Sequence, residues 1–216
     1  MKKILTTLLL IFMIIICFGF MFEDDSFDVS SLYDYQKEYE SEEVNACALG
    51  KTKTYMDYRA TTDPTSEQYW YIRNYMEVDE KTGFLLDEDG FIGAALGSYY
   101  GNIGDKYYFT LDSGVTIPIV KIEEKADRDT DASGCYHRLD GSVIEFVIDS
   151  DIAGDYFGTY RNGLVLQGNY ANYSIFKGEI EKVEKVSDKK REDYVTYVDS
   201  PDLMPSENIF EYASGY

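Results

Sequence analysis

Histidine, cysteine, proline and basic residues are all scarce in this chain of 216 residues. One His and three Cys are too few for a zinc site with the usual ligands, so we expect no metal site. Four Pro and 17 Gly exclude collagen-like and proline-rich repeats. Only 20 Lys and Arg stand against 40 Asp and Glu, and the net charge of −20 argues against a nucleic-acid partner, which requires a basic surface.

Several common catalytic motifs are missing as well. The sequence contains no phosphate-binding loop, no dinucleotide-binding glycine motif and no nucleophile elbow, so we expect no cofactor. Tyrosine, by contrast, is abundant, with 21 residues, and hydrophobic residues make up 44% of the chain. That fraction is enough for one domain with a real core.

Residues 1–22 predict a transmembrane anchor or a signal segment. Lys2 and Lys3 precede an apolar stretch at 4–22, and an acidic run at 23–25 follows it. As a helix the apolar stretch would span about 28 Å, close to the thickness of the hydrocarbon core of a bilayer. Positive charge before it and negative charge after it place the remainder outside the cell. An uncleaved anchor, which makes the membrane a partner, and a cleaved leader, which makes the protein secreted, both stay open.

Three regions follow the leader. Residues 23–50 are acidic and predict a linker, 51–186 predict a β-domain, and 187–216 begin with a charged cluster and predict a polar tail. A short helix is expected within 151–157. Strand-like segments separated by turn signals occupy 51–62, 67–73, 91–96, 105–111, 115–124, 142–149, 164–167 and 174–186. Such a series predicts an all-β barrel or sandwich.

Three stretches of this domain carry a resemblance to a known family. Residues 90–109 (GFIGAALGSYYGNIGDKYYF) give a strand of small residues, a spacer, and Gly104 before a β-strand. Residues 113–127 give a hairpin return that ends in acids, and 143–149 (VIEFVID) give an apolar strand with two acids four positions apart. In these respects the chain resembles the 3D-domain class of Gram-positive cell-wall proteins, named for three aspartates. The resemblance implies an all-β fold, a six-stranded double-psi β-barrel with additional strands, preceded here by the N-terminal transmembrane or signal helix.

The same resemblance places acids at the three aspartate positions of the family: Glu123, Glu145 and Asp149. Two of the three are Glu rather than Asp, and 125–134 replace the Thr-Gly dipeptide that follows the first acid. A shift of one residue would move the first acid to Glu124. The resemblance implies a protein that acts on peptidoglycan glycan strands, with lytic transglycosylase activity in some relatives.

Lytic transglycosylation needs one carboxyl group that donates a proton to the leaving oxygen and accepts one from the attacking sugar hydroxyl, whereas hydrolases need two carboxyl groups. Glu145 suits this role, because its apolar neighbours in the strand would raise its pKa. Asp149 shares its strand face, and Glu123 would lie on a facing strand. The structural alternative is that Glu145 pairs with a lysine such as Lys125, Asp149 caps a helix, and Glu123 is an exposed charge.

Tyr99, Tyr100 and His137 are the candidate substrate-binding residues. A Tyr ring can stack on a sugar while its hydroxyl forms hydrogen bonds, and His137 could carry a proton. The alternatives are that the Tyr side chains fill the core and that His137 is simply exposed. The rival function is therefore a non-catalytic barrel that binds wall glycan or a partner protein through a Tyr-rich surface.

Cys47 and Cys135 are the cysteines of the exported region. Export permits a disulfide between them, but two unrelated buried thiols would give the same sequence. Asp residues alternate at 127–131 like the start of a calcium loop, but Ala132 and Arg138 occupy the positions that such a loop gives to Gly and Glu. A calcium-stabilised structural module is a third hypothesis.

Overall fold

The computed structural model describes residues 27–47, 50–160, 164–165 and 168–191. The leader expected at 1–22 and most of the tail expected at 187–216 lie outside this part of the chain. Within the described residues, no helix is both long enough and apolar enough to cross a bilayer.

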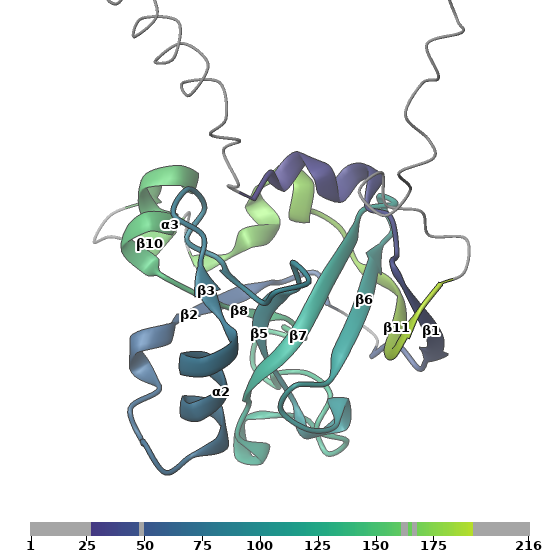
Figure 1. Cartoon of the computed structure of the whole chain (residues 1–216), viewed down its shortest axis with the longest axis horizontal. Coiled ribbons are helices and arrows are strands. Elements are labelled where there is room, and N and C mark those ends of the chain that lie inside the picture. Colours follow the sequence, from purple (N-terminus) through teal and green to yellow (C-terminus); the bar gives the residue numbers. More distant parts are fainter. Residues whose placement is uncertain (1–26, 48–49, 161–163, 166–167, 192–216) are drawn as a thin grey trace, which may run out of the picture.

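The described part is mostly β-sheet, with short helices packed around it (Figure 1). Nine strands form one open, mixed sheet. Its main path runs β1 (Tyr39–Val44), β11 (Ile180–Lys190), β6 (Lys106–Leu111), β7 (Thr116–Glu124), β5 (Ile92–Leu96), β4 (Leu85–Leu86) and β3 (Glu77–Val78). Strand β8 (Glu145–Ile148) pairs with β5 and with β2 (Thr54–Asp57), and a separate pair is formed by β9 (Thr159–Tyr160) and β10 (Leu164–Val165). The prediction of a β-rich domain is therefore confirmed.

Two of the strand pairings are parallel. β5 runs parallel to β7, and β2 runs parallel to β8, whereas the other pairings of the sheet are antiparallel. The β6–β7 hairpin lies where the sequence predicts it. Its turn at 112–114 ends on Gly114, which adopts a φ of 87° that glycine tolerates best, and the Leu111 N–H donates to the Val115 carbonyl at 2.8 Å.

The aromatic segment at 67–73 is a helix, and the prediction of a strand there is wrong. Helix α2 spans Glu67–Tyr75, and the hydroxyl of its N-cap Ser66 accepts a hydrogen bond from the Tyr69 N–H at 3.2 Å. This cap satisfies a backbone donor that the first helical turn would otherwise leave free. The strand propensity of the aromatic residues is outweighed by the cap and by burial of Ile72 beneath the helix.

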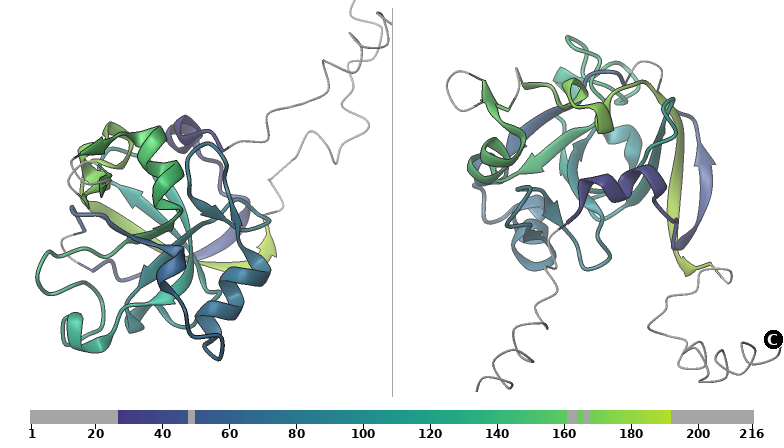
Figure 2. Two further views of the ribbon diagram at one scale, coloured as in Figure 1. Left: turned by 90° about the vertical axis from the view of Figure 1, so that its left-hand side faces the viewer. Right: turned by 90° about the horizontal axis from the view of Figure 1, so that it is seen from above.

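The acidic segment expected as a linker is part of the domain. Val29 and Leu32 of the 3₁₀ helix η1 (Val29–Asp34) are buried, and β1 pairs with β11 along the margin of the sheet (Figure 2). The acids of β1 do not prevent this pairing, because cationic side chains of β11 face them: Lys189 lies 2.6 Å from Glu40. The domain thus extends beyond both predicted limits, 51 and 186.

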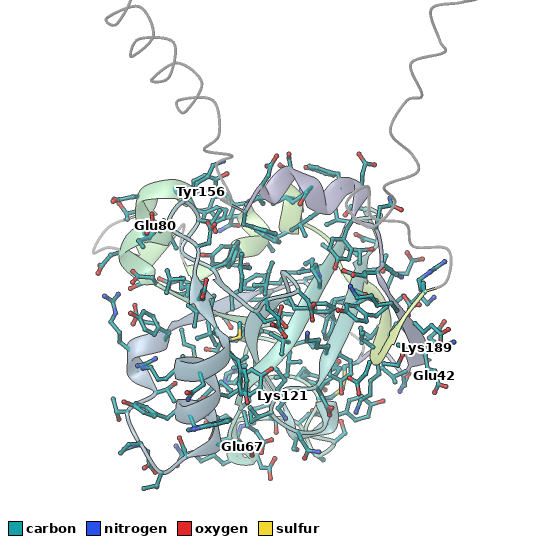
Figure 3. All side chains as sticks on the ribbon, viewed as in Figure 1. Glu42, Glu67, Glu80, Lys121, Tyr156 and Lys189 are labelled. Atoms are coloured by element: carbon teal, nitrogen blue, oxygen red, sulfur yellow. A yellow bond between two sulfur atoms is a disulfide. The ribbon has the colours of Figure 1, made fainter. Side chains whose placement is uncertain are left out.

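Apolar side chains pack on two faces of the sheet, and β8 contributes to both. Phe146 and Ile148 belong to the larger cluster, which also contains Phe84, Tyr170 and Phe176. Val147 belongs to the smaller cluster, where α2 contributes Ile72 and lies against β7. Because side chains alternate along a strand, Glu145 shares the face of Val147. Figure 3 shows how densely side chains fill the space around these strands.

Candidate functional site

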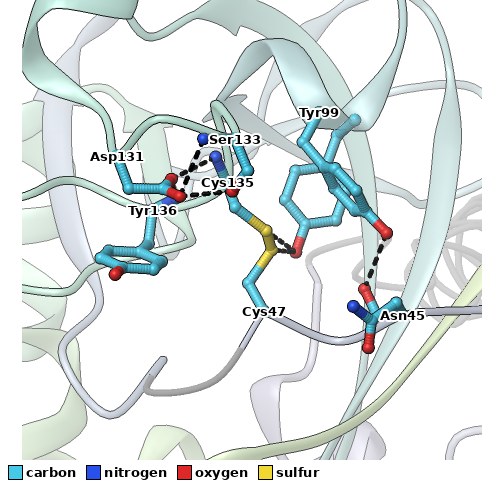
Figure 4. Close-up of a disulfide and its surroundings, with 8 residues drawn as sticks. Asn45, Cys47, Tyr99, Asp131, Ser133, Cys135 and Tyr136 are labelled. Carbon is cyan, nitrogen blue, oxygen red and sulfur yellow. Dashed lines mark hydrogen bonds between the residues drawn. A yellow bond between two sulfur atoms is a disulfide. The ribbon is translucent and has the colours of Figure 1, made fainter.

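A disulfide holds the long loop that borders the candidate site. Cys47 and Cys135 are bonded, with their Cα atoms 6.0 Å apart, so the predicted pairing is present (Figure 4). Within the loop, the Asp131 carboxylate accepts hydrogen bonds from the backbone N–H groups of Ser133, Cys135 and Tyr136. The loop 126–142 is therefore held by hydrogen bonds to its own Asp131 and by the disulfide to Cys47, which lies outside the loop.

The loop also docks closely on the end of β5. A side chain at Gly97 would place its Cβ 1.9 Å from the carbonyl oxygen of Gly134, so only glycine fits this approach without a shift. The Tyr99 N–H donates to the same carbonyl at 3.1 Å. These contacts bring the segment that carries His137 to the end of the sheet where Glu145 and Glu123 lie.

Glu145 and Glu123 belong to one row of residues across four strands. Glu145 pairs with Thr54 on one side and with Ala95 on the other, and Ala95 pairs with Glu123. An irregularity in the pairing beside Ala95 brings Glu123 into this row, and such bulges commonly re-aim a side chain next to a functional site. The two acids therefore lie on either side of a small residue, on strands β7 and β8 that are separated by β5.

Glu123 is the electrostatically unusual member of this pair. Its Oε2 is buried and has no hydrogen-bond partner among the described residues. Burial and the charge of Glu145 raise the pKa of the Glu123 carboxyl to about 7, although the nearby Thr61 hydroxyl offsets part of the rise. A carboxyl group with this pKa exchanges protons near neutral pH, so Glu123 is not the exposed charge that the structural alternative supposed.

Glu145 has the lysine neighbour that the structural alternative anticipated. Lys125 Nζ lies 3.7 Å from Glu145 Oε2 and donates to the carbonyl and the hydroxyl of Ser142, each at 3.2 Å. Burial lowers the pKa of Lys125, and the charge of Glu145 works against that change. The ammonium group compensates the charge of Glu145 and has no ion pair with Glu123.

Glu145 also lines a hollow that reaches the surface. The hollow has a volume of about 420 Å³ and is lined by Thr54, Tyr55, His137, Asp140, Ser142, Glu145 and Gly168. His137 Nδ1 lies 3.2 Å from Asp140 Oδ1, a distance that allows an ion pair when the imidazole is protonated. The structure therefore brings His137 and Glu145 to one hollow. Glu123 does not line this hollow and lies on the other side of Ala95 from Glu145.

Asp149 lies at the far end of β8 and does not join this group. Four residues of extended chain separate it from Glu145, about 13 Å. It is the N-cap of α3 (Ser150–Phe157), where its Oδ1 accepts from the N–H groups of Asp151 and Ile152, and it lies 3.3 Å from Arg59. The capping alternative describes its surroundings, and Asp149 does not line the hollow of Glu145 as a member of the candidate site was expected to.

The two tyrosines selected as substrate ligands differ from each other. Tyr100 is 1% exposed and its hydroxyl lies 3.1 Å from Cys47 Sγ, so it fills the core as the alternative supposed and cannot stack on a ligand. Tyr99 is 40% exposed, and its hydroxyl donates to the Asn45 carbonyl at 3.2 Å (Figure 4). Tyr99 borders the disulfide loop and does not line the hollow of Glu145.

A second cavity escaped the sequence analysis. It has a volume of about 920 Å³ and lies between the end of α2 and the β3–β4 hairpin. Tyr71 and Tyr75 line it. They are four residues apart, a spacing that places side chains on one face of a helix. The prediction of a strand at 67–73 hides this signal.

In the part of the chain that the structure describes, no three His, Cys, Asp or Glu side chains are grouped to hold a metal ion. No family model, no curated protein and no solved structure matches this chain.

Proposed function

We propose that the protein acts on peptidoglycan glycan strands outside the cell, with Glu123 and Glu145 as the acid–base centre of a lytic transglycosylase. The observation that carries this proposal is the raised pKa of Glu123, about 7, beside a second carboxyl group. A general acid that must also act as a base works best when its pKa lies near the working pH. The leader at 1–22 would hold the protein at the membrane, or would release it if cleaved.

The proposed reaction follows from these two acids. Protonated Glu123 donates to the glycosidic oxygen while the bond from that oxygen to C1 breaks. The carboxylate then accepts the proton of the sugar's own 6-hydroxyl while that oxygen bonds to C1, so a 1,6-anhydro end forms and no water is consumed. Glu145, which remains beside Lys125 and lines the hollow, stabilises the positive charge that develops at C1.

The finer fold assignment belongs to the same proposal. We infer a double-psi β-barrel of the 3D-domain class, in which the parallel pairs β5–β7 and β2–β8 are the crossing elements. The sequence resemblance over 90–149 and the position of Glu123 and Glu145 beside one another support this assignment.

The test is a product analysis with the full-length chain and purified peptidoglycan. We expect anhydro-sugar ends by mass spectrometry, and we expect Glu123→Gln and Glu145→Gln each to reduce them by about a hundredfold. Asp149→Asn is the matched control, because it changes an acid that directly follows β8 and caps α3, about 13 Å along the chain from Glu145, and it should retain activity. A folded wild-type protein that yields no product between about pH 5 and about pH 8 would refute the enzyme.

A non-catalytic glycan-binding module is the second candidate. Two observations favour it: Lys125 occupies one side of Glu145, and the ring of Tyr99 is exposed. Sedimentation with peptidoglycan distinguishes it from the enzyme. Retention without product, lost in Tyr99→Ala and kept in Glu123→Gln, would establish binding instead of catalysis.

A further inference from the structure

The cavity beside α2 differs in kind from the hollow of Glu145. Its walls come from the last turn of α2 and from the β3–β4 hairpin (lower and upper left of Figure 1), and its volume of about 920 Å³ is suited to several amino-acid side chains. Met76, Val78 and Leu86 supply an apolar part of the lining. None of the residues proposed for glycan chemistry lines it.

Aromatic rings form one wall of this cavity. The rings of Tyr71 and Tyr75 lie 4.9 Å apart, and Trp70 packs edge-on against Tyr75 at 5.2 Å. Trp70 is 53% exposed and Tyr75 is 51% exposed. Apolar rings left open to solvent beside a cavity favour a ligand that covers them.

The charges around the cavity are predominantly negative. The exposed Glu77, Glu80 and Glu88 line it, and none of them forms an ion pair with another described residue. Lys106, which also lines it, is neutralised by Asp87 at 2.7 Å and by Asp89 at 2.6 Å. An occupant that carries positive charge would therefore gain both ion pairs and contact with the faces of the Tyr rings.

Arg73 does not reverse this balance. Its guanidinium lies over the rings of Tyr58 and Tyr69, at 5.0 Å from each centroid. The guanidinium is therefore already in contact with aromatic groups of this chain. Three glutamates line the cavity against this one arginine, so negative charge remains in excess.

The cavity also borders an end of the sheet. Strand β3 is the last strand of the main path, so one of its edges has no strand partner in the described part of the chain. Met76, Glu77 and Val78 are consecutive residues of this segment, and all three line the cavity. An extended peptide can form hydrogen bonds with such an edge while its side chains enter the adjoining pocket.

We propose that this cavity binds an extended peptide segment that carries lysine or arginine side chains next to apolar ones. The peptide backbone pairs with β3, its cationic groups lie among Glu77, Glu80 and Glu88, and its apolar groups cover Tyr75. The inference does not depend on the glycan chemistry proposed for Glu123 and Glu145.

The only Trp of the sequence, Trp70, gives a direct test. The full-length chain in mild detergent is titrated with an octapeptide of alternating Lys and Val while Trp fluorescence is followed. We expect a saturable change, about tenfold weaker binding at high salt, and a loss of the change when every Lys is acetylated. An N-methylated peptide, which keeps the charge but cannot pair with a strand, should also bind about tenfold more weakly.

Matched variants locate the binding. Glu77→Gln with Glu80→Gln should weaken it about tenfold, whereas Glu42→Gln with Glu43→Gln, the same change on β1, should leave it unchanged. Glu42 and Glu80 lie on opposite sides of the molecule (Figure 3). Tyr75→Ala, followed by calorimetry because it alters the surroundings of Trp70, should weaken binding as well. Equal binding of the acetylated peptide, an equal effect of both double variants, or saturation by a neutral chito-oligosaccharide in place of the peptide would overturn the proposal.

Discussion

Glu123 and Glu145 are the two register neighbours of Ala95, one on each side, and only Glu145 has a lysine beside it among the described residues. This asymmetry explains their different electrostatics. The ammonium of Lys125 compensates the charge of Glu145, while Glu123 experiences burial and the charge of its neighbour without a cation. The pair therefore combines an acid that has a lysine beside it with a carboxyl group that retains its proton toward neutral pH.

The first prediction concerns the pH dependence of stability. The pKa of Glu123 is raised from 4.5 to about 7 in the folded protein, so the folded state holds this proton more tightly than the unfolded state. Its contribution is fully present below about pH 4.5 and is lost as pH rises through about 7. As pH rises from about 4.5 to about 7, the free energy of unfolding of Glu123→Gln should therefore increase by about 1 kcal/mol relative to that of wild type. This value is reduced for solvent screening at a half-buried site.

Urea denaturation of both proteins at several pH values measures that difference. Glu145→Gln is the second variant to measure, because removal of its charge should lower the pKa of Glu123. Stability should then depend on pH over a narrower range than in wild type. A stability difference between Glu123→Gln and wild type that is independent of pH would contradict the assigned pKa.

A second prediction separates Asp149 from the acid–base centre. Asp149→Ala removes the acceptor of two N–H groups at the start of α3 and should lower the free energy of unfolding by about 1 kcal/mol. Asp149→Asn keeps a capping oxygen and should lower the free energy of unfolding by only about 0.3 kcal/mol. Denaturation curves of the two variants provide the comparison, and equal losses would count against the capping role.

The third prediction addresses the disulfide. Cys47 and Cys135 are 88 positions apart, and loss of a cross-link of this span should destabilise the protein by about 4.6 kcal/mol in the chain-entropy model. Cys47→Ser and Cys135→Ser should be equally harmful, and the double variant should be no worse than either single one. Thermal unfolding with and without reductant measures the effect, and strongly additive single losses would point to independent buried thiols.

The fourth prediction tests the docking of loop 126–142. Gly97→Ala forces its Cβ against the Gly134 carbonyl and should destabilise the protein by about 2 kcal/mol. Disulfide formation should also be slower, because Cys135 directly follows Gly134 in the chain. Gly114→Ala is the comparison, since a Cβ there meets nothing within 4 Å and only the positive φ opposes it, at about 1 kcal/mol. Equal oxidation rates for wild type and Gly97→Ala would show that the loop tolerates the shift.

The parts of the fold that sequence predicts well are those with local signals. The β6–β7 hairpin follows from alternation on both sides of an Asp-Ser-Gly turn, and the helix after Asp149 follows from an N-cap at a strand end. Helix α2 was missed because one hydroxyl, that of Ser66, decides between helix and strand for a run of aromatic residues. The acidic β1 was missed because its pairing depends on β11, which lies far away in the sequence.

The candidate site shows the same division. The acids at 123 and 145 were selected through the resemblance of the sequence to a known family, but their relative roles could not be predicted in this way. Which acid receives Lys125 depends on the path of the loop after β7, and which acid is buried depends on the irregularity beside Ala95. The burial of Tyr100 was equally hidden, since Tyr99 and Tyr100 are adjacent and only the fold decides which one points inward.

The disulfide between Cys47 and Cys135 also changes what a cut in the chain does to the molecule. The turn at 62–65 is exposed, and it lies within the span that the disulfide closes. A protease that opens one peptide bond there produces two chains that are still joined through sulfur. The nicked protein therefore migrates as a single species until a reductant separates its two fragments.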